Sequence, residues 1–185
     1  MSISTQLMTA EQLIKLPRGR FRYELVRGEL LTMSPAGEEH GAITANLTAE
    51  LYRYVKENRL GVVYGAETGF KLERNPDTVL APDVSFISRD RVGQISKQYR
   101  EGAPDLAVEV ISPNERRNRI EKKVGQWLQL GARLVWIVNP QTKSVTVYRP
   151  DGSVRVLSKS DELTGDDLIP GFTISVSDVF KLGNF

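Results

Sequence analysis

The chain has 185 residues, of which 40% are hydrophobic and 26% charged, with a formal net charge of +2 and no cysteine. This length is typical of one compact unit, so we expect a single domain over residues 1–185. The lack of cysteine excludes disulfides and thiolate metal ligands, and no apolar stretch approaches the roughly 18 to 20 residues that a membrane helix needs.

The first part of the chain predicts two helices with a hairpin between them. A hydroxyl at Thr9 and an amide at Gln12 form a capping box, which opens a short helix that ends before Pro17. Gly28 suits the turn of a hairpin that begins the sheet, and apolar residues at helical spacing then predict a long helix. The predicted strands are 21–26 and 29–33, and the predicted long helix is 38–57.

Strands dominate the rest of the chain. A polar segment at 88–102 is expected to be a loop, and an apolar strand, a helix and a second apolar strand follow it. Such a unit indicates parallel pairing through a right-handed crossover. The predicted elements are strands 62–64, 67–72, 81–87 and 105–111, a helix at 116–130, a strand at 134–138, a hairpin of 144–148 with 153–157, and from residue 163 a short strand and a helical turn. This order predicts an α/β fold, a mixed sheet flanked by helices with extra antiparallel strands towards both ends.

Two acidic residues lie in strongly apolar strands. Asp83 stands near the start of one strand and Glu109 lies in another, on a face with core-like neighbours. A buried carboxylate is costly unless something compensates it, and a divalent metal is the simplest compensation. If the two strands are adjacent, both carboxylates and the main-chain carbonyl of Val110 would offer Mg²⁺ an oxygen-rich site. Structural roles stay open, with Asp83 as a turn former and Glu109 as the partner of an arginine.

Helical geometry places Lys123 at the inner edge of the second long helix. At 100° per residue Lys123 lies about 60° from the apolar Ile120, whereas Lys122 lies about 160° away and faces solvent. The Lys123 ammonium could therefore point towards the end of the Glu109 strand and stabilise charge that develops on a phosphate. The alternative is a lysine whose stem covers the core while its ammonium reaches water.

Glu24 and His40 are secondary candidates. His40, the single histidine, begins the inward stripe of the first long helix, where a hydrogen-bonding role is the simpler account. Glu24 could be a third acid, although an exposed hairpin face is the simpler account. Basic residues also gather around the second long helix, where they could contact a nucleic-acid backbone or form a solvated surface. The candidates for such contacts are Arg116, Arg117, Arg119 and Lys122.

Short motifs along nearly the whole chain resemble the Uma-type family of restriction endonucleases. They are Tyr23–Leu30, Ser34-Pro35, His40, Ala81–Val84, Ala103–Pro113, Lys123 with Trp127, Trp136–Pro140 and Leu168–Phe172. The resemblance implies the restriction-endonuclease-like fold and an active site of the PD-(D/E)XK type, with Asp83 and Glu109 as its acids. Ile111 stands where the usual motif has its lysine, and Lys123 on the following helix matches the position that this family uses instead.

The resemblance also implies what the protein does. It implies a DNA endonuclease that uses Mg²⁺, or Mn²⁺ in its place, and that acts as a homodimer. Arg119 and Asn139 depart from the family, because relatives often have an acid at each position. The alternative is a catalytically inactive module that keeps the fold and binds nucleic acid or protein. We expect a cytoplasmic protein, because the start of the chain lacks the features of an export signal, and no nucleotide cofactor, because the chain has no glycine-rich phosphate loop.

Overall fold

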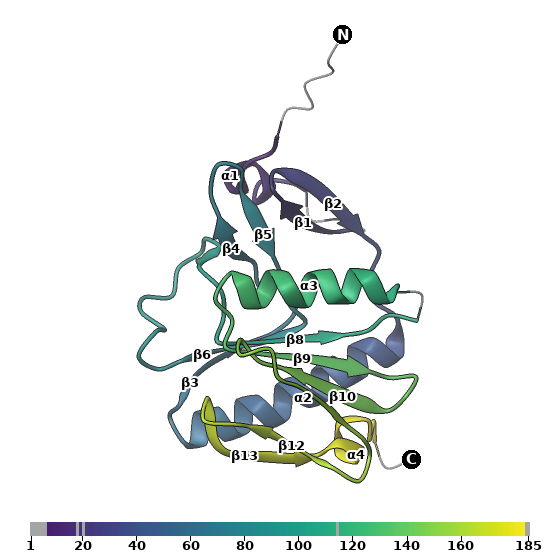
Figure 1. The fold of residues 1–185 in the computed structure, drawn as a ribbon. Helices are drawn as coiled ribbons and strands as arrows, with labels where there is room; N and C mark the ends of the chain where they lie inside the picture. The colour runs from purple at the N-terminus through teal and green to yellow at the C-terminus, as the bar shows by residue number, and fades with distance from the viewer. Residues whose placement is uncertain (1–6, 18, 20, 114, 184–185) are drawn as a thin grey trace.

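The computed structural model describes residues 7–17, 19, 21–113 and 115–183, and a mixed sheet forms its centre (Figure 1). The strands of this sheet are β3 (Gly61–Tyr64), β6 (Val84–Ser88), β8 (Leu106–Val110), β9 (Leu134–Asn139), β10 (Ser144–Tyr148) and β11 (Val154–Leu157). Their order across the sheet is β11-β10-β9-β8-β6-β3. Strands β8 and β9 pair in parallel and all other neighbours pair antiparallel, which confirms the predicted mixed sheet and the predicted parallel unit.

Helices cover both faces of the central sheet, with α3 (Arg117–Gln129) above it and α2 (Glu38–Glu57) below it in Figure 1. On the α3 side Trp127 is fully buried, in a cluster that also contains Ala107 of β8. On the other side the apolar stripe of α2 from Ile43 to Val55 packs on the sheet. The same core includes the C-terminal elements β12 (Glu162–Gly165), β13 (Ile169–Ser175) and α4 (Val176–Val179). Alternation along β8 therefore directs Glu109 to the α3 side.

The N-terminal hairpin belongs to a second sheet, so the expectation that it begins the main sheet is wrong. The strands of the second sheet are β1 (Arg22–Val26), β2 (Glu29–Met33), β4 (Phe70–Glu73), β5 (Thr78–Leu80) and β7 (Arg100–Glu101). Their order is β2-β1-β5-β4-β7, and β5 holds β1 through the pair Leu25 and Val79. The hairpin turn has φ of 52° at Arg27 and 80° at Gly28, which suits a two-residue turn of type I′.

Three further details differ from the predicted elements. The strand predicted at 67–72 begins at Phe70, the strand predicted at 81–87 begins at Val84, and β5 lies between them. The C-terminal region contains a hairpin rather than one short strand. The short helix α1 (Ala10–Leu13) has its predicted capping box and packs on the second sheet through Ala10 and Leu13. In the part of the chain that the structure describes, no helix is both long enough and apolar enough to cross a membrane.

Candidate active site

Strand pairing brings the two predicted acids together. Strands β6 and β8 are antiparallel neighbours with Val84 opposite Val108, so Asp83 and Glu109 lie one register step further along. The main-chain N–H of Asp83 donates to the Val108 carbonyl over 3.0 Å, which continues the ladder to this point. Both acids are buried, with relative exposures of 3% for Asp83 and 9% for Glu109. The condition that the two strands are adjacent is therefore met.

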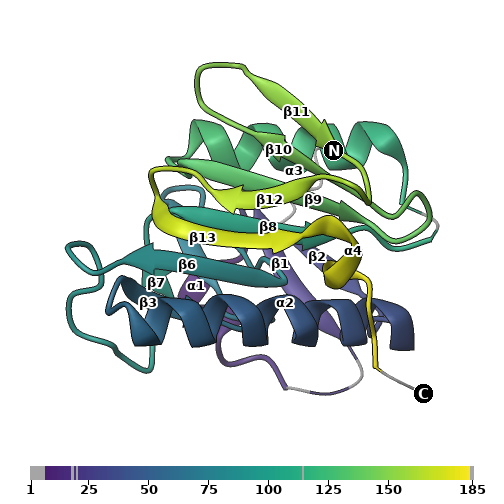
Figure 2. The ribbon, with the colours of Figure 1, turned by 90° about the horizontal axis from the view of Figure 1, so that it is seen from below.

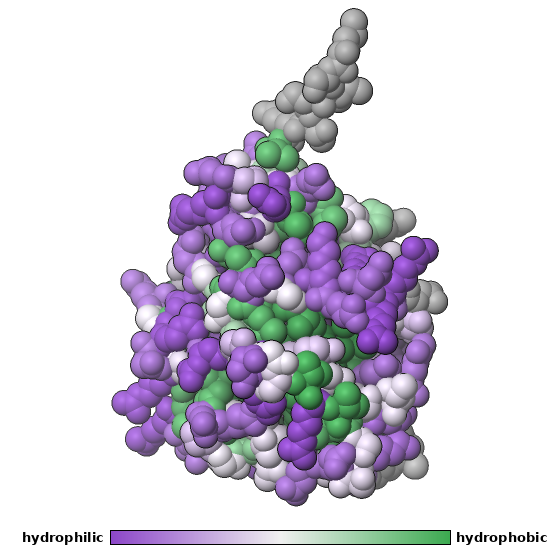
Figure 3. All heavy atoms as spheres, in the orientation of Figure 1, coloured by the Kyte–Doolittle hydropathy of each residue, from purple (hydrophilic) through white to green (hydrophobic). Residues whose placement is uncertain are grey.

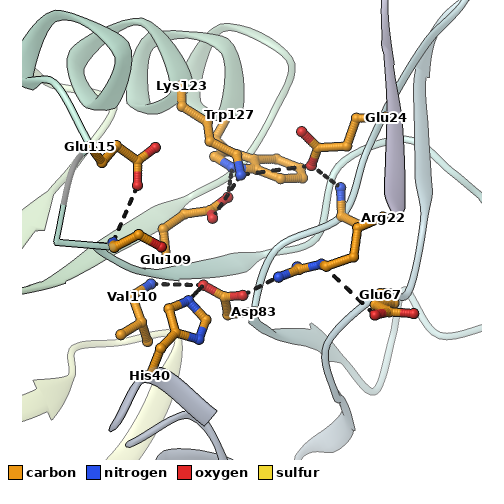
Figure 4. A network of polar contacts seen from close by, with 12 residues as sticks. Arg22, Glu24, His40, Glu67, Asp83, Glu109, Val110, Glu115, Lys123 and Trp127 are labelled. Carbon is orange, nitrogen blue, oxygen red and sulfur yellow. Dashed lines mark hydrogen bonds and ion pairs between the residues drawn. The ribbon is translucent and has the colours of Figure 1, made fainter. Parts of the chain in front are cut away.

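Helix α3 supplies two partners for the Glu109 carboxylate (Figure 4). Lys123 Nζ lies 2.8 Å from Glu109 Oε2, and Trp127 Nε1 donates to Oε1 over 2.8 Å. Positions 123 and 127 are one turn apart on the inner side of α3, so both donors reach the same strand. The neighbouring Lys122 is exposed, as its predicted direction required.

Three groups hold the Asp83 carboxylate. Arg22 Nη2 lies 3.3 Å from Oδ1, His40 Nε2 lies 3.1 Å from Oδ2, and the Val110 N–H donates to Oδ2 over 2.9 Å. His40, a secondary candidate from the sequence, is thus a direct partner of Asp83. Val110, the candidate carbonyl ligand, also lines the cavity next to Asp83 and Glu109. Figure 4 shows these groups converging on Asp83 from α2, β1 and β8.

Glu24 completes the cluster from the second sheet. It is 3% exposed, its Oε1 accepts the Ala81 N–H over 2.9 Å, and the same oxygen lies 3.7 Å from Lys123 Nζ. The expectation of an exposed hairpin face is wrong, because β1 packs against the segment before β6. Arg22 was not a sequence candidate. It lies two residues before Glu24 on β1 and hence on the same face, which is the signal that could have found it.

Asp83 and Glu109 differ in protonation behaviour because their surroundings differ. Burial, together with the nearby charges of Asp83 and Glu24, raises the pKa of Glu109 to about 7 in spite of Lys123. Burial also opposes ionisation of Asp83, but hydrogen bonding to His40 and to the Val110 N–H holds the pKa of Asp83 below its usual value. The Asp83 hydrogen bond raises the pKa of His40. Burial opposes the charge on Lys123, and the surrounding carboxylates outweigh it and raise the pKa of that ammonium. Carboxyls with separated pKa values are typical of sites that hold metals or move protons.

The donor atoms fit a hard divalent cation. Among the described residues no group of three or more His, Cys, Asp or Glu side chains is arranged to hold a metal ion. An ion at Asp83 and Glu109 would therefore take its other ligands from main-chain carbonyls and water, which is how Mg²⁺ is usually held. Burial is the main cause of the raised pKa of Glu109, with the charges of Asp83 and Glu24 adding to it, and a bound cation would favour the ionised form.

A cavity of about 470 Å³ opens beside this cluster. Its lining includes Asp83, Glu109, Lys123 and Arg119, so one of the four predicted basic residues lies beside the same cavity as the acids. The others, Arg116, Arg117 and Lys122, are exposed, and Arg117 Nε pairs with Glu121 over 2.8 Å. Figure 3 shows hydrophilic side chains gathered over the N-terminal end of α3. The arrangement can bind a cation next to a site of positive charge, which suits a phosphate ester.

Two comparisons with known proteins place this chain, one by its fold and one by its sequence. The fold is similar to the crystal structure of a "putative nuclease belonging to DUF820" from Anabaena variabilis, with a TM-score of 0.80 and 22% identity over 95% of this chain and 98% of that one. Residues 10–177 match the family model described as "Uma2: Putative restriction endonuclease", so the chain belongs to the Uma2 family. No match is found among curated proteins.

Proposed function

We propose that this protein is a metal-dependent nuclease that hydrolyses phosphodiester bonds of DNA. The observation that carries the proposal is the buried Glu109 carboxylate, held 2.8 Å from Lys123 Nζ and opposite Asp83, one register step beyond the Val84–Val108 pair. The description of the Uma2 family as restriction endonucleases supports the reaction class and DNA as the substrate.

Asp83, Glu109 and the main-chain carbonyl of Val110 would hold the Mg²⁺ or Mn²⁺ ion. A bound ion of this kind polarises a phosphoryl oxygen and lowers the pKa of a water, which becomes the nucleophile. Asp83 keeps a fixed orientation because His40, Arg22 and the Val110 N–H hold both of its oxygens. It also remains ionised at neutral pH, because His40 and the Val110 N–H outweigh burial and lower its pKa.

Glu109 and Lys123 have different roles in the proposed mechanism. Trp127 fixes Glu109 through Oε1, and a bound cation would favour the ionised form of this carboxyl, whose pKa burial raises to about 7 in the metal-free protein. Lys123 remains protonated because the carboxylates raise its pKa, so it brings a fixed positive charge to the cavity. That charge stabilises the negative charge that grows on the phosphoryl oxygens in the transition state.

Plasmid nicking tests the proposal. Purified protein is incubated with supercoiled DNA and Mg²⁺ or Mn²⁺, and Asp83→Ala, Glu109→Gln and Lys123→Ala are compared with two matched controls at exposed positions, Glu162→Gln and Lys159→Ala. We expect nicking that requires the cation, is lost in the three site variants and is kept in the controls. Equal cutting by all three site variants, or cutting without a divalent cation, would contradict the proposal.

Two further outcomes of the same preparation are informative. DNA binding without cutting under any metal condition would indicate the alternative, a non-catalytic nucleic-acid-binding module. A homodimer is part of the proposal because restriction-type enzymes commonly cut two strands with two subunits, and light scattering of the purified protein measures it. If the protein is a monomer that nicks one strand, the proposed hydrolytic site stands and the proposed homodimer is wrong.

A further inference from the structure

A second and larger cavity, of about 730 Å³, joins the candidate active site. It lies between α2 and the second sheet, and its lining includes residues from α1, β1 and the N-terminal part of α2. Arg22, His40 and Asp83 line both this cavity and the smaller one beside Glu109. The two cavities therefore share the Asp83 carboxylate, and a ligand that occupies one reaches the edge of the other. We call the larger cavity the α2 groove.

One face of α2 forms the floor of the α2 groove. Ala45 and Ala49 on this face are exposed, whereas Ile43 and Leu47 on the opposite side are fully buried in the core. The α2 residues that line the groove lie three or four positions apart and are mostly small. Besides His40, they are Gly41, Thr44, Ala45, Thr48, Ala49 and Tyr52. This face extends for roughly 16 Å at 1.5 Å per residue, and Figure 2 shows α2 along its length at the edge of the molecule.

The α2 groove offers aromatic surface and an unused polar group. Phe21 is 51% exposed and Tyr52 is 50% exposed, and both line the groove together with Tyr23. Exposed aromatic rings in a groove are the surfaces on which the bases of an unpaired strand stack. Thr44, which is 8% exposed, lines the same groove, and its hydroxyl has no hydrogen-bond partner among the described residues. Buried polar atoms are normally paired, so this hydroxyl is an exception beside the groove.

Positive charge lies beyond Tyr52, at the far end of α2 from Asp83. Lys56, Arg59 and Arg89 line a shallow pocket that also includes Tyr52, and all three are exposed. We call these three residues the basic patch. Lys56 Nζ lies 5.3 Å from the centre of the Tyr52 ring. No salt bridge to a described residue neutralises the basic patch, whereas the nearby Arg53 is paired with acids of its own helix.

We propose that the α2 groove and the basic patch bind an unpaired strand of nucleic acid, which runs from Asp83 over Tyr52 to the patch. Bases rather than phosphates suit the groove, because its walls are apolar and aromatic and its inner end is acidic. In a duplex the faces of the bases are stacked inside, so only an unpaired strand can present them. The length of roughly 16 Å corresponds to about five stacked nucleotides at ~3.4 Å each. Phosphates of that strand then reach the basic patch.

This inference deepens the proposed function, because it names single-stranded or locally unpaired nucleic acid as the substrate class. The test measures binding without cutting, so that it stands apart from the nicking assay. A fluorescent 12-nucleotide single strand and the duplex of the same sequence are titrated with full-length protein in EDTA, with anisotropy as the readout. We expect the single strand to bind at least about tenfold more tightly than the duplex.

Variants of the groove localise the binding. Tyr52→Ala removes one stacking surface and should weaken single-strand binding by about 5- to 150-fold. Ala49→Trp fills the groove at an exposed helix position and should weaken binding to a similar degree, while Gln129→Trp, at an exposed position of α3, serves as the matched control. Arg59→Glu combined with Arg89→Glu should weaken binding and flatten its salt dependence. Circular dichroism melting verifies that each variant folds.

The outcomes separate this proposal from its competitors. Equal binding of single strand and duplex, or unchanged binding in folded Tyr52→Ala and Ala49→Trp, would overturn it. If Ala49→Trp changes the oligomeric state and leaves nucleic-acid binding intact, the groove holds a second copy of the chain and the proposal is wrong. Single-strand binding that persists where nicking is never seen overturns the proposed nuclease alone.

Discussion

Lys71 and Lys123 each hold carboxylates in the interior, in different parts of the molecule. Lys71 lies on β4 of the second sheet, 3.1 Å from Asp77 Oδ2 and 3.1 Å from Glu11 Oε1. Asp77 Oδ2 also accepts the Ala10 N–H over 2.7 Å, so this cluster fastens α1 to the second sheet. Lys123 instead faces a cavity, with Glu109 at 2.8 Å and Glu24 at 3.7 Å.

The pKa of the buried acid distinguishes the two clusters. Burial opposes ionisation of Asp77, but the Ala10 N–H and Lys71 outweigh it and lower the pKa of that carboxyl. Glu11, the other partner of Lys71, is 68% exposed and leaves its charge in water. Around Lys123 all the carboxylates are buried, and the pKa of Glu109 rises to about 7. Burial and a lysine partner are thus common to both clusters. The Lys123 cluster differs in its three buried carboxylates and in the raised pKa of Glu109, and we expect a cation site there on that ground.

The largest expected effect is a loss of stability in the Lys71 cluster, which we infer to hold the fold together and to take no part in nicking. Asp77→Ala leaves Lys71 buried without its buried partner and frees the Ala10 N–H, so we expect a loss of about 3–5 kcal/mol in the free energy of unfolding. Urea denaturation measures it, and nicking per folded molecule should be unchanged. Glu11→Gln, at the exposed partner, should cost much less than Asp77→Ala, because water screens an exposed ion pair. Loss of nicking in folded Asp77→Ala would make the Lys71 cluster part of the active site.

Substitution in the Lys123 cluster should reduce nicking strongly and stability less. Lys123→Met removes the charge that faces the phosphate, so we expect nicking to fall by about 100- to 1,000-fold. The free energy of unfolding should fall by less than in Asp77→Ala, because Glu109 titrates near pH 7 and can take up a proton when its partner is lost. Urea denaturation of the two variants side by side measures the contrast. If Lys123→Met lost much stability and kept its nicking rate, the proposed contrast between the two clusters would be wrong.

Local periodicity was sufficient to find most of the site. Alternation along the strand marked Glu109 as an acid on a core face, and the angle of 100° per residue turned Lys123 inwards. The adjacency of the Asp83 and Glu109 strands entered only as a condition. The structure confirms the mixed sheet, the adjacency and the direction of Lys123. The cation, the DNA substrate and the catalytic roles of these residues stay predictions.

The parts that the sequence did not reveal depend on contacts between distant segments. Glu24 reaches the site because its carboxylate accepts an N–H from Ala81, 57 residues away, and no local pattern encodes that contact. The second sheet was missed because β5 has only three residues, Thr78–Leu80, which is too short for an alternation to register. Once β5 is placed between β1 and β4, the burial of Glu24 and the position of Arg22 beside Asp83 follow.

A smaller effect should distinguish the two buried tryptophans. Trp127→Phe keeps most of the ring and removes the N–H that Glu109 Oε1 accepts, so the ionised carboxylate loses about 1–3 kcal/mol of stabilisation. The pKa of Glu109 should rise further, which moves the rising limb of the nicking rate to higher pH, with recovery near pH 9. Trp136→Phe is the matched control, because Trp136 Nε1 is buried and lacks a hydrogen-bond partner among the described residues. Identical pH profiles for the two variants would show that Trp127 does not position Glu109.

The smallest expected effect concerns the proton that Glu109 holds. With a pKa of about 7, Glu109 is mostly protonated at pH 6 and mostly ionised at pH 8, so a cation competes with a proton only at the lower pH. Mn²⁺ affinity from titration calorimetry should therefore be about tenfold weaker at pH 6 than at pH 8, a difference of about 1.4 kcal/mol. The pKa of Asp83 is lowered, so Asp83 stays ionised between pH 6 and pH 8 and does not contribute to the change of Mn²⁺ affinity with pH.

The same linkage fixes the sign of the effect on stability. Because the pKa of Glu109 is raised by folding, its contribution to stability is fully present below the unfolded pKa and is lost as pH rises through about 7. Mn²⁺ opposes that loss, so it should raise the melting temperature more at pH 8 than at pH 6. Glu109→Gln should abolish this difference between the two pH values. A substitution in the Lys71 cluster should leave the difference unchanged. Equal shifts at both pH values would mean that the raised pKa of Glu109 does not mark a cation site.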